Sequence, residues 1–245
     1  MPTDTIYLLI AGIFLIGFLY SSVGHAGASG YIAVMSLIGM APSEIKPTAL
    51  LLNILVASIT AWQFYRSGHF AWSLFWPFAA LAIPFAFLGG YINLPTAWFK
   101  MLVGVILLYS AWRFLAKPAE AATTTPPRKP VALATGAGLG LLSGLTGTGG
   151  GIFLTPLMLF MRWAPVKRVA AVSSLFILVN STAGLAGNWS STQYLPPVSL
   201  WLLVAAGIGG ALGSHFGSRR FNPAVIKRLL AIVLTIAGAK LLFGG

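Results

Sequence analysis

The chain has 245 residues, of which 58 % are hydrophobic and only 7 % are charged. A soluble domain carries about 25 % charged residues, so the composition and a mean hydropathy of +0.89 exclude an ordinary soluble protein and predict an all-α integral membrane protein. The net charge is +12, and the three acidic residues, Asp4, Glu44 and Glu120, all lie outside the apolar runs, which disfavours a cation pathway lined by buried carboxylates.

Apolar segments of helical type follow one another along the chain. We expect ten of them, at about 5–23, 28–41, 47–65, 71–93, 97–115, 131–146, 150–161, 168–187, 196–217 and 224–243. Between the fifth and the sixth, "AKPAEAATTTPPRKP" is rich in Pro and Thr and is typical of a linker. We therefore divide the chain into a first membrane repeat (1–115), a cytoplasmic linker (116–130) and a second membrane repeat (131–245).

The two halves are similar in sequence when one is shifted by 123 residues. "GHAGASGYIAVMSLIGMAP", which begins at Gly24, then aligns with "GTGGGIFLTPLMLFMRWAP", which begins at Gly147. From there to Ser58 and Ser181, 10 of 35 positions are identical. Duplicated halves are common in transporters. Because each half has five segments, an odd number, we expect the two repeats to lie inverted in the membrane.

Lysine and arginine predict the orientation, because they gather in cytoplasmic loops. If all ten segments cross and the linker is cytoplasmic, 12 of these residues lie inside and 3 lie outside, namely Lys46, Lys100 and Lys240. If the short second and seventh segments instead dip in and return, the ratio becomes 6 inside to 9 outside. The charges therefore favour ten crossings, with both termini outside.

Glycine-rich stretches at residues 24–30 and 147–151 precede the two short segments. A helix over 28–41 would span about 21 Å, less than the hydrocarbon core of about 30 Å, so we expect each glycine stretch to run as an irregular loop at membrane depth. Free N–H groups and the positive end of a helix dipole bind anions, and inverted repeats would bring two such ends together near the midplane. Close helix packing is the alternative, which we prefer for Gly12, Gly17, Gly136, Gly138 and Gly140.

Two motifs carry a resemblance to a known family. "GLTGTGGGIFLTPLML" is followed by "AAVSSLF" at residues 170–176, and the first half has the counterparts "GHAGASGYIAVM" and "KPTALLLNILVAS". This pairing resembles the sulfite exporter TauE/SafE family of bacterial anion permeases over essentially the whole chain. It implies a multi-pass protein of the bacterial inner membrane that moves sulfite, sulfoacetate or other organosulfonates. The chain departs from the family at Val172-Ser173-Ser174, where members often have Gly-Thr-Ser.

The candidate anion ligands come from the two loops and from the helices that follow them. Asn53, Ser173, Ser174 and Asn180 could donate to sulfonate oxygens without a full countercharge, and their alternative role is hydrogen bonding between helices. His25 aligns with Thr148 and is also a candidate carrier of a coupling proton, because histidine titrates near physiological pH; a neutral structural histidine is the alternative. The loop candidates are Gly24, His25, Gly27, Gly147, Thr148, Gly149, Gly150 and Gly151.

These features favour a secondary transporter that works by alternating access, with export as the expected direction and an anion channel on the same scaffold as the alternative. Catalysis is disfavoured, because the chain has no cysteine, three scattered histidines and no acid within an apolar segment. "GLTGTGGG" lacks the Gly-Lys-Ser/Thr ending of a P-loop, and we expect no cofactor. The expected partners are a small anion and the lipid bilayer; nucleic acid is not expected, and a homo-oligomer is left open.

Overall fold

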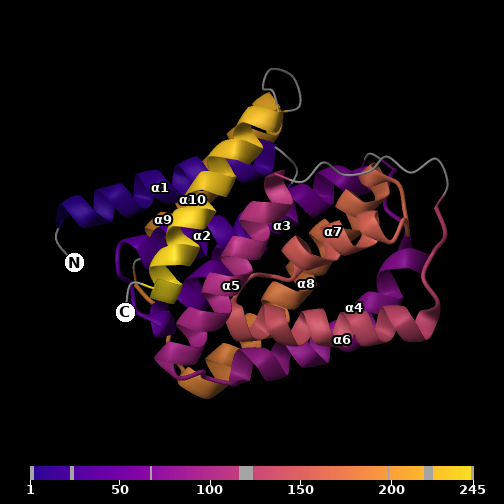
Figure 1. Cartoon of the computed structure of the whole chain (residues 1–245), viewed down its shortest axis with the longest axis horizontal. Helices are drawn as coiled ribbons and strands as arrows, with labels where there is room; N and C mark the ends of the chain where they lie inside the picture. Colours follow the sequence, from indigo (N-terminus) through magenta and orange to yellow (C-terminus); the bar gives the residue numbers. More distant parts are fainter. Residues whose placement is uncertain are drawn as a thin grey trace.

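The computed structural model describes residues 3–22, 25–66, 68–115, 124–197, 199–217 and 223–243. Within them the chain forms ten α-helices and no strand, so the predicted all-α fold is confirmed (Figure 1). The first half holds α1 (Thr3–Ser22), α2 (Ala28–Leu37), α3 (Pro42–Arg66), α4 (Trp72–Tyr91) and α5 (Thr96–Leu115). The second half holds α6 (Lys129–Thr146), α7 (Gly151–Phe160), α8 (Val166–Thr192), α9 (Ser199–Gly217) and α10 (Pro223–Phe243).

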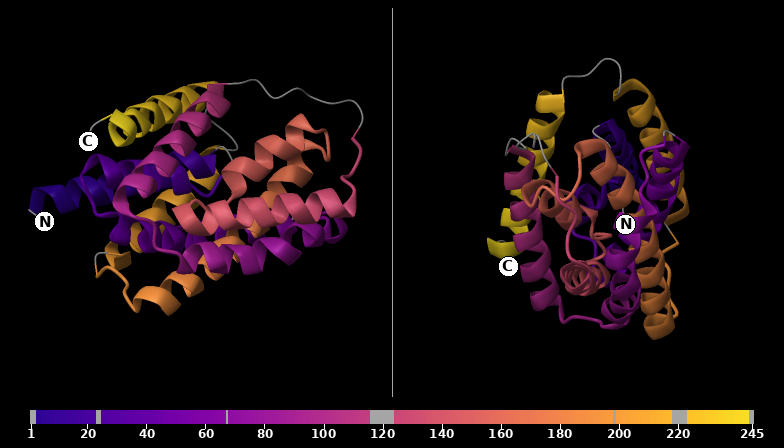
Figure 2. Two further views of the ribbon diagram at one scale, coloured as in Figure 1. Left: turned by 60° about the horizontal axis from the view of Figure 1, so that its bottom comes forward. Right: turned by 90° about the vertical axis from the view of Figure 1, so that its right-hand side faces the viewer.

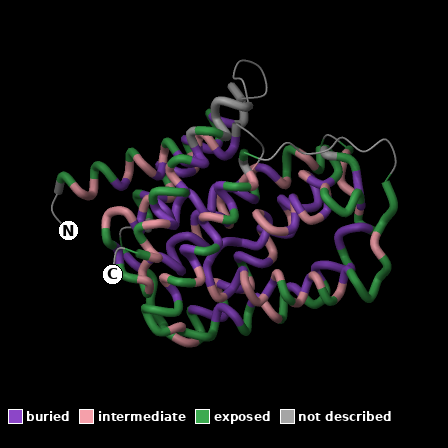
Figure 3. The backbone as a smooth tube through the Cα atoms, viewed as in Figure 1, coloured by how far each residue is buried: buried purple, intermediate pink, exposed green. Residues whose placement is uncertain are grey.

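The surface of the helices is suited to lipid. Among the described residues, α1, α3, α4 and α8 are by length and composition able to cross a bilayer, and α2, α7, α9 and α10 contain shorter apolar runs. Large apolar side chains point outward, including Leu8, Leu200 and Trp201, which are 64 %, 66 % and 66 % exposed. Buried positions concentrate on the inward faces of the helices (Figure 3). The protein is therefore an all-α membrane protein.

The two halves of the sequence interlock in space. α1 packs along α9, and α4 packs against both α6 and α8. One hydrophobic core includes residues of α1, α2, α3 and α9, and the other joins α4, α6, α7 and α8. Each of these two groups thus combines the first three helices of one half with the fourth helix of the other. The division at residues 116–130 and the inversion of the repeats stay predictions.

The fifth helix of each half, α5 and α10, contributes buried residues to the first of these cores. α5 and α10 pack against each other on one face of the molecule (Figure 2). α10 also packs along α2, whereas the corresponding approach of α5 to α7 rests on stacked rings of Tyr109 and Phe153, with centroids 6.0 Å apart. The α5–α10 pair therefore packs mainly against the first group, and its contacts with α2 and α7 are not symmetric.

Two hydrogen bonds bear on the number of crossings. The Thr125 N–H donates to the Arg162 carbonyl oxygen at 2.9 Å, and the Lys240 ammonium donates to the Leu37 carbonyl oxygen at 2.7 Å. With ten crossings, each bond joins two segments predicted to lie on the same side of the membrane. With eight crossings, each bond would join opposite sides. The structure thus agrees with the crossing pattern that the charges predict.

Glycines let α4 approach its neighbours closely. A Cβ on Gly136 would overlap the Phe78 carbonyl oxygen, and one on Gly140 would overlap that of Ala82. Gly12 and Gly17 similarly face Val34 and the Ala206 backbone, at 2.8 and 3.1 Å from an added Cβ. The predicted packing role is confirmed for these four positions. It is wrong for Gly138, because no atom of the described residues lies within 4 Å of a Cβ built there.

Candidate anion site

The predicted break before α2 is present but shorter than expected. Gly24 lies outside the described residues, and α2 already begins at Ala28, so residues 28–30 are helical rather than irregular. The break among the described residues is therefore 25–27. Gly27 precedes the helix with φ of +98°, a left-handed conformation that side chains other than glycine rarely adopt.

The break before α7 matches the prediction more closely. Residues 147–150 are non-helical, and Gly151 is the first residue of α7 rather than part of the loop. Gly147 ends α6, with φ of +80° and its N–H donating to the Ser143 carbonyl oxygen at 2.8 Å. Gly149 and Gly150 also have positive φ, +73° and +77°. This succession of left-handed residues explains why the loop is built from glycine.

Unpartnered polar atoms gather beside Gly149. A Cβ built on this glycine would lie 2.8 Å from the Asn53 Nδ2 atom and 2.9 Å from the Ser181 Oγ atom. Asn53 and Ser181 are fully buried, and neither the amide nor the hydroxyl has a hydrogen-bond partner among the described residues. A buried polar group left unpaired costs about 1–3 kcal/mol. The side chains of α3 and α8 therefore present unpaired donors at the N-terminal end of α7, and the protein bears this loss of stability.

The remaining candidates of the second half differ in how free they are. Ser173 is buried and its Oγ has no partner among the described residues. Ser174 instead donates to the Ala171 carbonyl oxygen at 2.9 Å, and Asn180 donates through Nδ2 to the Phe176 carbonyl oxygen at 2.9 Å. The Thr148 hydroxyl lies 3.0 Å from that of Thr146. Ser173 thus remains available, while Ser174 and Asn180 already bond to the backbone of their own helix.

The first loop has different surroundings. A Cβ on Gly27 would lie 2.9–3.1 Å from the ring of Tyr31, which is fully buried. The neighbouring Tyr20 and Ser29 hydroxyls are 2.6 Å apart, and the His25 N–H donates to the Tyr20 carbonyl oxygen at 2.9 Å. Aromatic side chains thus surround this loop. α2 packs on α3 and α7 packs on α8, and the meeting of the two helix ends at the midplane stays a prediction.

Lys46 is a residue whose role the sequence did not suggest. The count of lysines and arginines treated it only as a charge on the outer side. In the structure it is buried in the second turn of α3, with 4 % of its surface exposed. Its ammonium donates to three carbonyl oxygens at the end of α4, those of Gly89, Gly90 and Ile92, at 3.1, 2.7 and 2.8 Å. Its own carbonyl oxygen lies 3.0 Å from a Cβ built on Gly147. Lys46 therefore links the glycine loop to the end of α4.

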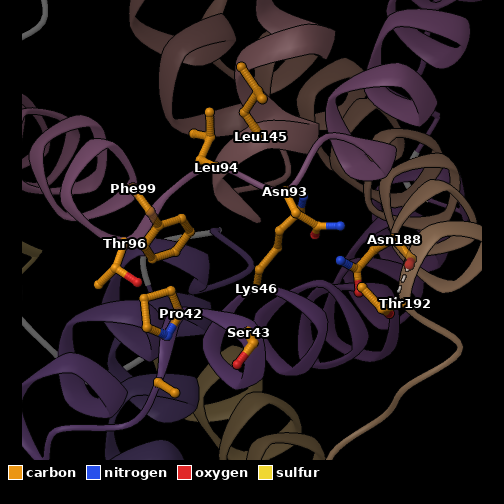
Figure 4. A pocket seen from close by; sticks show the side chains of 11 residues that line it. Pro42, Ser43, Lys46, Asn93, Leu94, Thr96, Phe99, Leu145, Asn188 and Thr192 are labelled. Atoms are coloured by element: carbon orange, nitrogen blue, oxygen red, sulfur yellow. Dashed lines mark hydrogen bonds between the residues drawn. The ribbon is translucent and has the colours of Figure 1, made fainter.

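The side chain of Lys46 also lines a hollow of about 260 Å³. Asn93 and Asn188 line the same hollow (Figure 4). Leu145, two residues before Gly147, forms part of the wall, so the hollow reaches the end of α6 that leads into the glycine loop.

Ser181 could have been found from the sequence, because it is one of the positions identical between the repeats. Ser143 carries a similar signal: it stands directly before the glycine motif, is fully buried and has an unpartnered Oγ among the described residues. An added Cβ on Gly150 would lie 3.4 Å from the Ser143 Cβ atom. Both serines therefore belong to the surroundings of the second loop.

Comparison with known proteins places this architecture in a family. The sulfite exporter TauE/SafE family model matches residues 9–241. A probable membrane transporter protein of Sinorhizobium fredii, y4hK, is 42 % identical over 99 % of this chain and 100 % of its own length. YunE and YjnA of Bacillus subtilis, also described as probable membrane transporter proteins, are 31 % identical over 44 % of this chain and 39 % of YunE, and 22 % identical over 97 % of this chain and 100 % of YjnA. No solved structure matches the chain. The protein belongs to the sulfite exporter TauE/SafE family and is a membrane transporter.

Proposed function

We propose that the chain is a secondary transporter that exports small sulfur-containing anions, such as sulfite, sulfoacetate or other organosulfonates, across the bacterial inner membrane. The observation that carries this proposal is the pair of unpartnered buried groups, the Asn53 amide and the Ser181 hydroxyl, beside Gly149. They lie at the N-terminal end of α7, where first-turn N–H groups and the helix dipole favour negative charge.

The chemistry of these groups suits transport better than permanent binding. Neutral amide and hydroxyl donors stabilise an anion by hydrogen bonds but bring no full positive charge, so release stays feasible. Sulfite and sulfonate groups present three oxygens to such donors. The buried and unpartnered Ser173 hydroxyl on α8 extends the same donor set, whereas the Thr148 hydroxyl already donates to that of Thr146, which itself donates to the Leu142 carbonyl oxygen. We expect no catalytic role for any of these residues.

Burial supports a carrier over an open channel. Asn53, Ser181 and Asn180 are all 0 % exposed, so the donors are closed off from both ends of the molecule. A transporter that alternates between two openings passes through such a closed arrangement. With ten crossings, the termini lie outside and the linker in the cytoplasm.

Flux into proteoliposomes tests the proposal. We expect saturable uptake of labelled sulfite, with trans-stimulation by unlabelled substrate, and competition by a panel of sulfoacetate, taurine, sulfate and carboxylate analogues defines the preferred anion. A channel would show no trans-stimulation.

Ser181→Ala is expected to reduce sulfite flux on the order of tenfold through loss of one donor. The matched control is Ser174→Ala on the same helix, whose hydroxyl bonds to its own backbone; equal losses in both variants would contradict this site.

A further inference from the structure

Two hollows lie side by side where the ends of α2, α4, α8 and α10 meet the beginnings of α3 and α5. The larger, of about 260 Å³, is lined by Lys46, Asn93 and Asn188 among others. The smaller, of about 140 Å³, is lined by Ser36, Lys100 and Lys240 among others. Pro42 and Phe99 line both, so they form the wall between the two hollows. We call the two hollows together the vestibule.

The vestibule gathers all three lysines that the ten-crossing pattern assigns to the outer side, Lys46, Lys100 and Lys240. No aspartate or glutamate is among the described residues that line it. The nearest acid along the chain, Glu44, accepts through Oε2 from the Ala41 N–H at 3.4 Å, and Ala41 lines the larger hollow, so one carboxylate lies beside the three lysines. The lining therefore carries an excess of positive charge.

The three ammonium groups differ in their hydrogen bonding. Lys46 and Lys240 are held by carbonyl oxygens at the ends of α4 and α2. A helix C-terminus carries about half a negative charge, so each of these lysines keeps part of its charge uncompensated. Lys100 is half-buried, and its ammonium makes no hydrogen bond or ion pair within the described part of the chain. Its ammonium is available to a ligand.

Neutral polar groups complete the lining. The Ser36 Oγ atom in the smaller hollow is buried and has no partner among the described residues. In the larger hollow, Asn188 is 3 % exposed, and its Oδ1 has no hydrogen-bond partner among the described residues. Its side-chain amide can therefore offer a ligand either a donor or an acceptor. Ser43 and Thr96 add hydroxyls.

We propose that the vestibule is a second anion-binding site, in series with the cluster at Gly149, that takes a small sulfite- or sulfonate-type oxyanion together with part of its hydration. Its volume fits this, because a water molecule occupies about 30 Å³. Its position fits as well, because Lys46 lines the larger hollow with its side chain and contacts Gly147 with its backbone. The inference rests on the proposed function in taking the bound anion to be the transported one.

Such a site changes the apparent affinity on one face only. Positive charge in a recess raises the local concentration of anions, and the effect weakens as salt screens it. We expect Lys100→Gln combined with Lys240→Gln to raise the KM for sulfite on the outer face on the order of tenfold, with kcat unchanged. KM on the cytoplasmic face should stay as in the wild type. Right-side-out and inside-out vesicles measure the two faces separately.

A matched control carries the same loss of charge elsewhere. Lys167→Gln combined with Arg168→Gln removes two exposed charges at the start of α8, away from the vestibule, and should leave the outer-face KM unchanged. If the vestibule variant leaves the outer-face KM unchanged, or if the control raises it equally, the proposal is overturned while the proposed transport function stands.

A binding measurement separates this inference from the transport proposal. In purified protein carrying Asn53→Leu, which lacks the central amide, we expect sulfite to raise the unfolding temperature still, and this shift to vanish when Lys100→Gln and Lys240→Gln are added. That result supports the vestibule even if no sulfur anion is transported. A shift that survives all three substitutions would contradict it.

Discussion

At the scale of single residues, Gly149 shows how backbone and site depend on one another. Its φ of +73° favours glycine, and an added Cβ would also collide with the Asn53 amide and the Ser181 hydroxyl. The glycine pattern was visible in the sequence, since such density is unusual within apolar segments. The partners were only partly visible: Asn53 stood out as an amide in an apolar run, whereas Ser181 was marked only by its identity with Ser58 in the other repeat, and the fold brings it to the loop.

Alanine at Gly149 separates backbone strain from the site. Gly68 has the same φ of +73°, but within the described part of the chain no atom lies within 4 Å of an added Cβ, so it is a matched control. We expect Gly149→Ala and Gly68→Ala each to lose about 1–2 kcal/mol through left-handed strain. Only Gly149→Ala should abolish sulfite flux in proteoliposomes, because only there does the methyl group displace donors. Comparable flux losses in both variants would reduce the role of Gly149 to a turn.

The buried position of the Lys46 ammonium could not be predicted from the sequence. Loop charges are counted by position, and nothing in the sequence shows that this ammonium turns inward to the end of a helix more than forty residues away. We expect Lys46→Met to lower the unfolding midpoint in detergent by the equivalent of about 1.5–3 kcal/mol, since three carbonyl oxygens lose a charged donor. Lys100→Met, which removes no hydrogen bond within the described residues, should leave the midpoint unchanged; a drop of the same size there would argue against specific capping.

At the scale of helices, hydropathy and the glycine-rich stretches between apolar segments predicted where the helices lie but not where they end. The segment expected at 28–41 is α2 (Ala28–Leu37), and the one expected at 150–161 is α7 (Gly151–Phe160). The predicted break at 24–30 was too long, because Ala28, Ser29 and Gly30 join the helix once Ser29 bonds to Tyr20 and Gly30 faces Ile16. Tertiary contacts of this kind override the weak helix propensity of glycine.

The contact between α4 and α6 gives a sharp test of helix packing. Gly140→Ala would push a methyl group against the Ala82 carbonyl oxygen, and we expect it to cost about 1–3 kcal/mol as the two helices separate. Gly138 lies two residues away on the same helix in open space, so Gly138→Ala should be neutral or should stabilise by about 0.5–1 kcal/mol. Thermal unfolding in detergent measures both. Equal destabilisation by the two alanines would contradict the close approach of α4 to α6.

At the scale of the whole molecule, the repeat predicted which segments correspond but not which of them are neighbours. Hydropathy identifies an apolar helix without saying which partner it takes, so the exchange of α4 and α9 between the halves could not be foreseen. The asymmetry of the loops was foreseeable only in part: Tyr31, whose ring lies against Gly27, aligns with Leu154, so the aromatic neighbour of the first loop has an aliphatic counterpart in α7.

The absence of cysteine makes the topology directly measurable. We expect Thr125→Cys, within the linker, to react with a membrane-impermeant maleimide only in inside-out vesicles. Tyr194→Cys, between α8 and α9, should react only in right-side-out vesicles, because ten crossings place it outside. Both positions are exposed, so access is not limited by burial. Labelling of both from the same side would refute the ten-crossing arrangement.

The position of the bound anion tests the central claim most directly. In a density map of the purified protein with saturating sulfite, we predict the anion at the start of α7, with oxygens about 3 Å from the Asn53 Nδ2 and Ser181 Oγ atoms. A map in which the Asn53 amide bonds to other protein groups, and sulfite binds away from Gly149, would contradict the account.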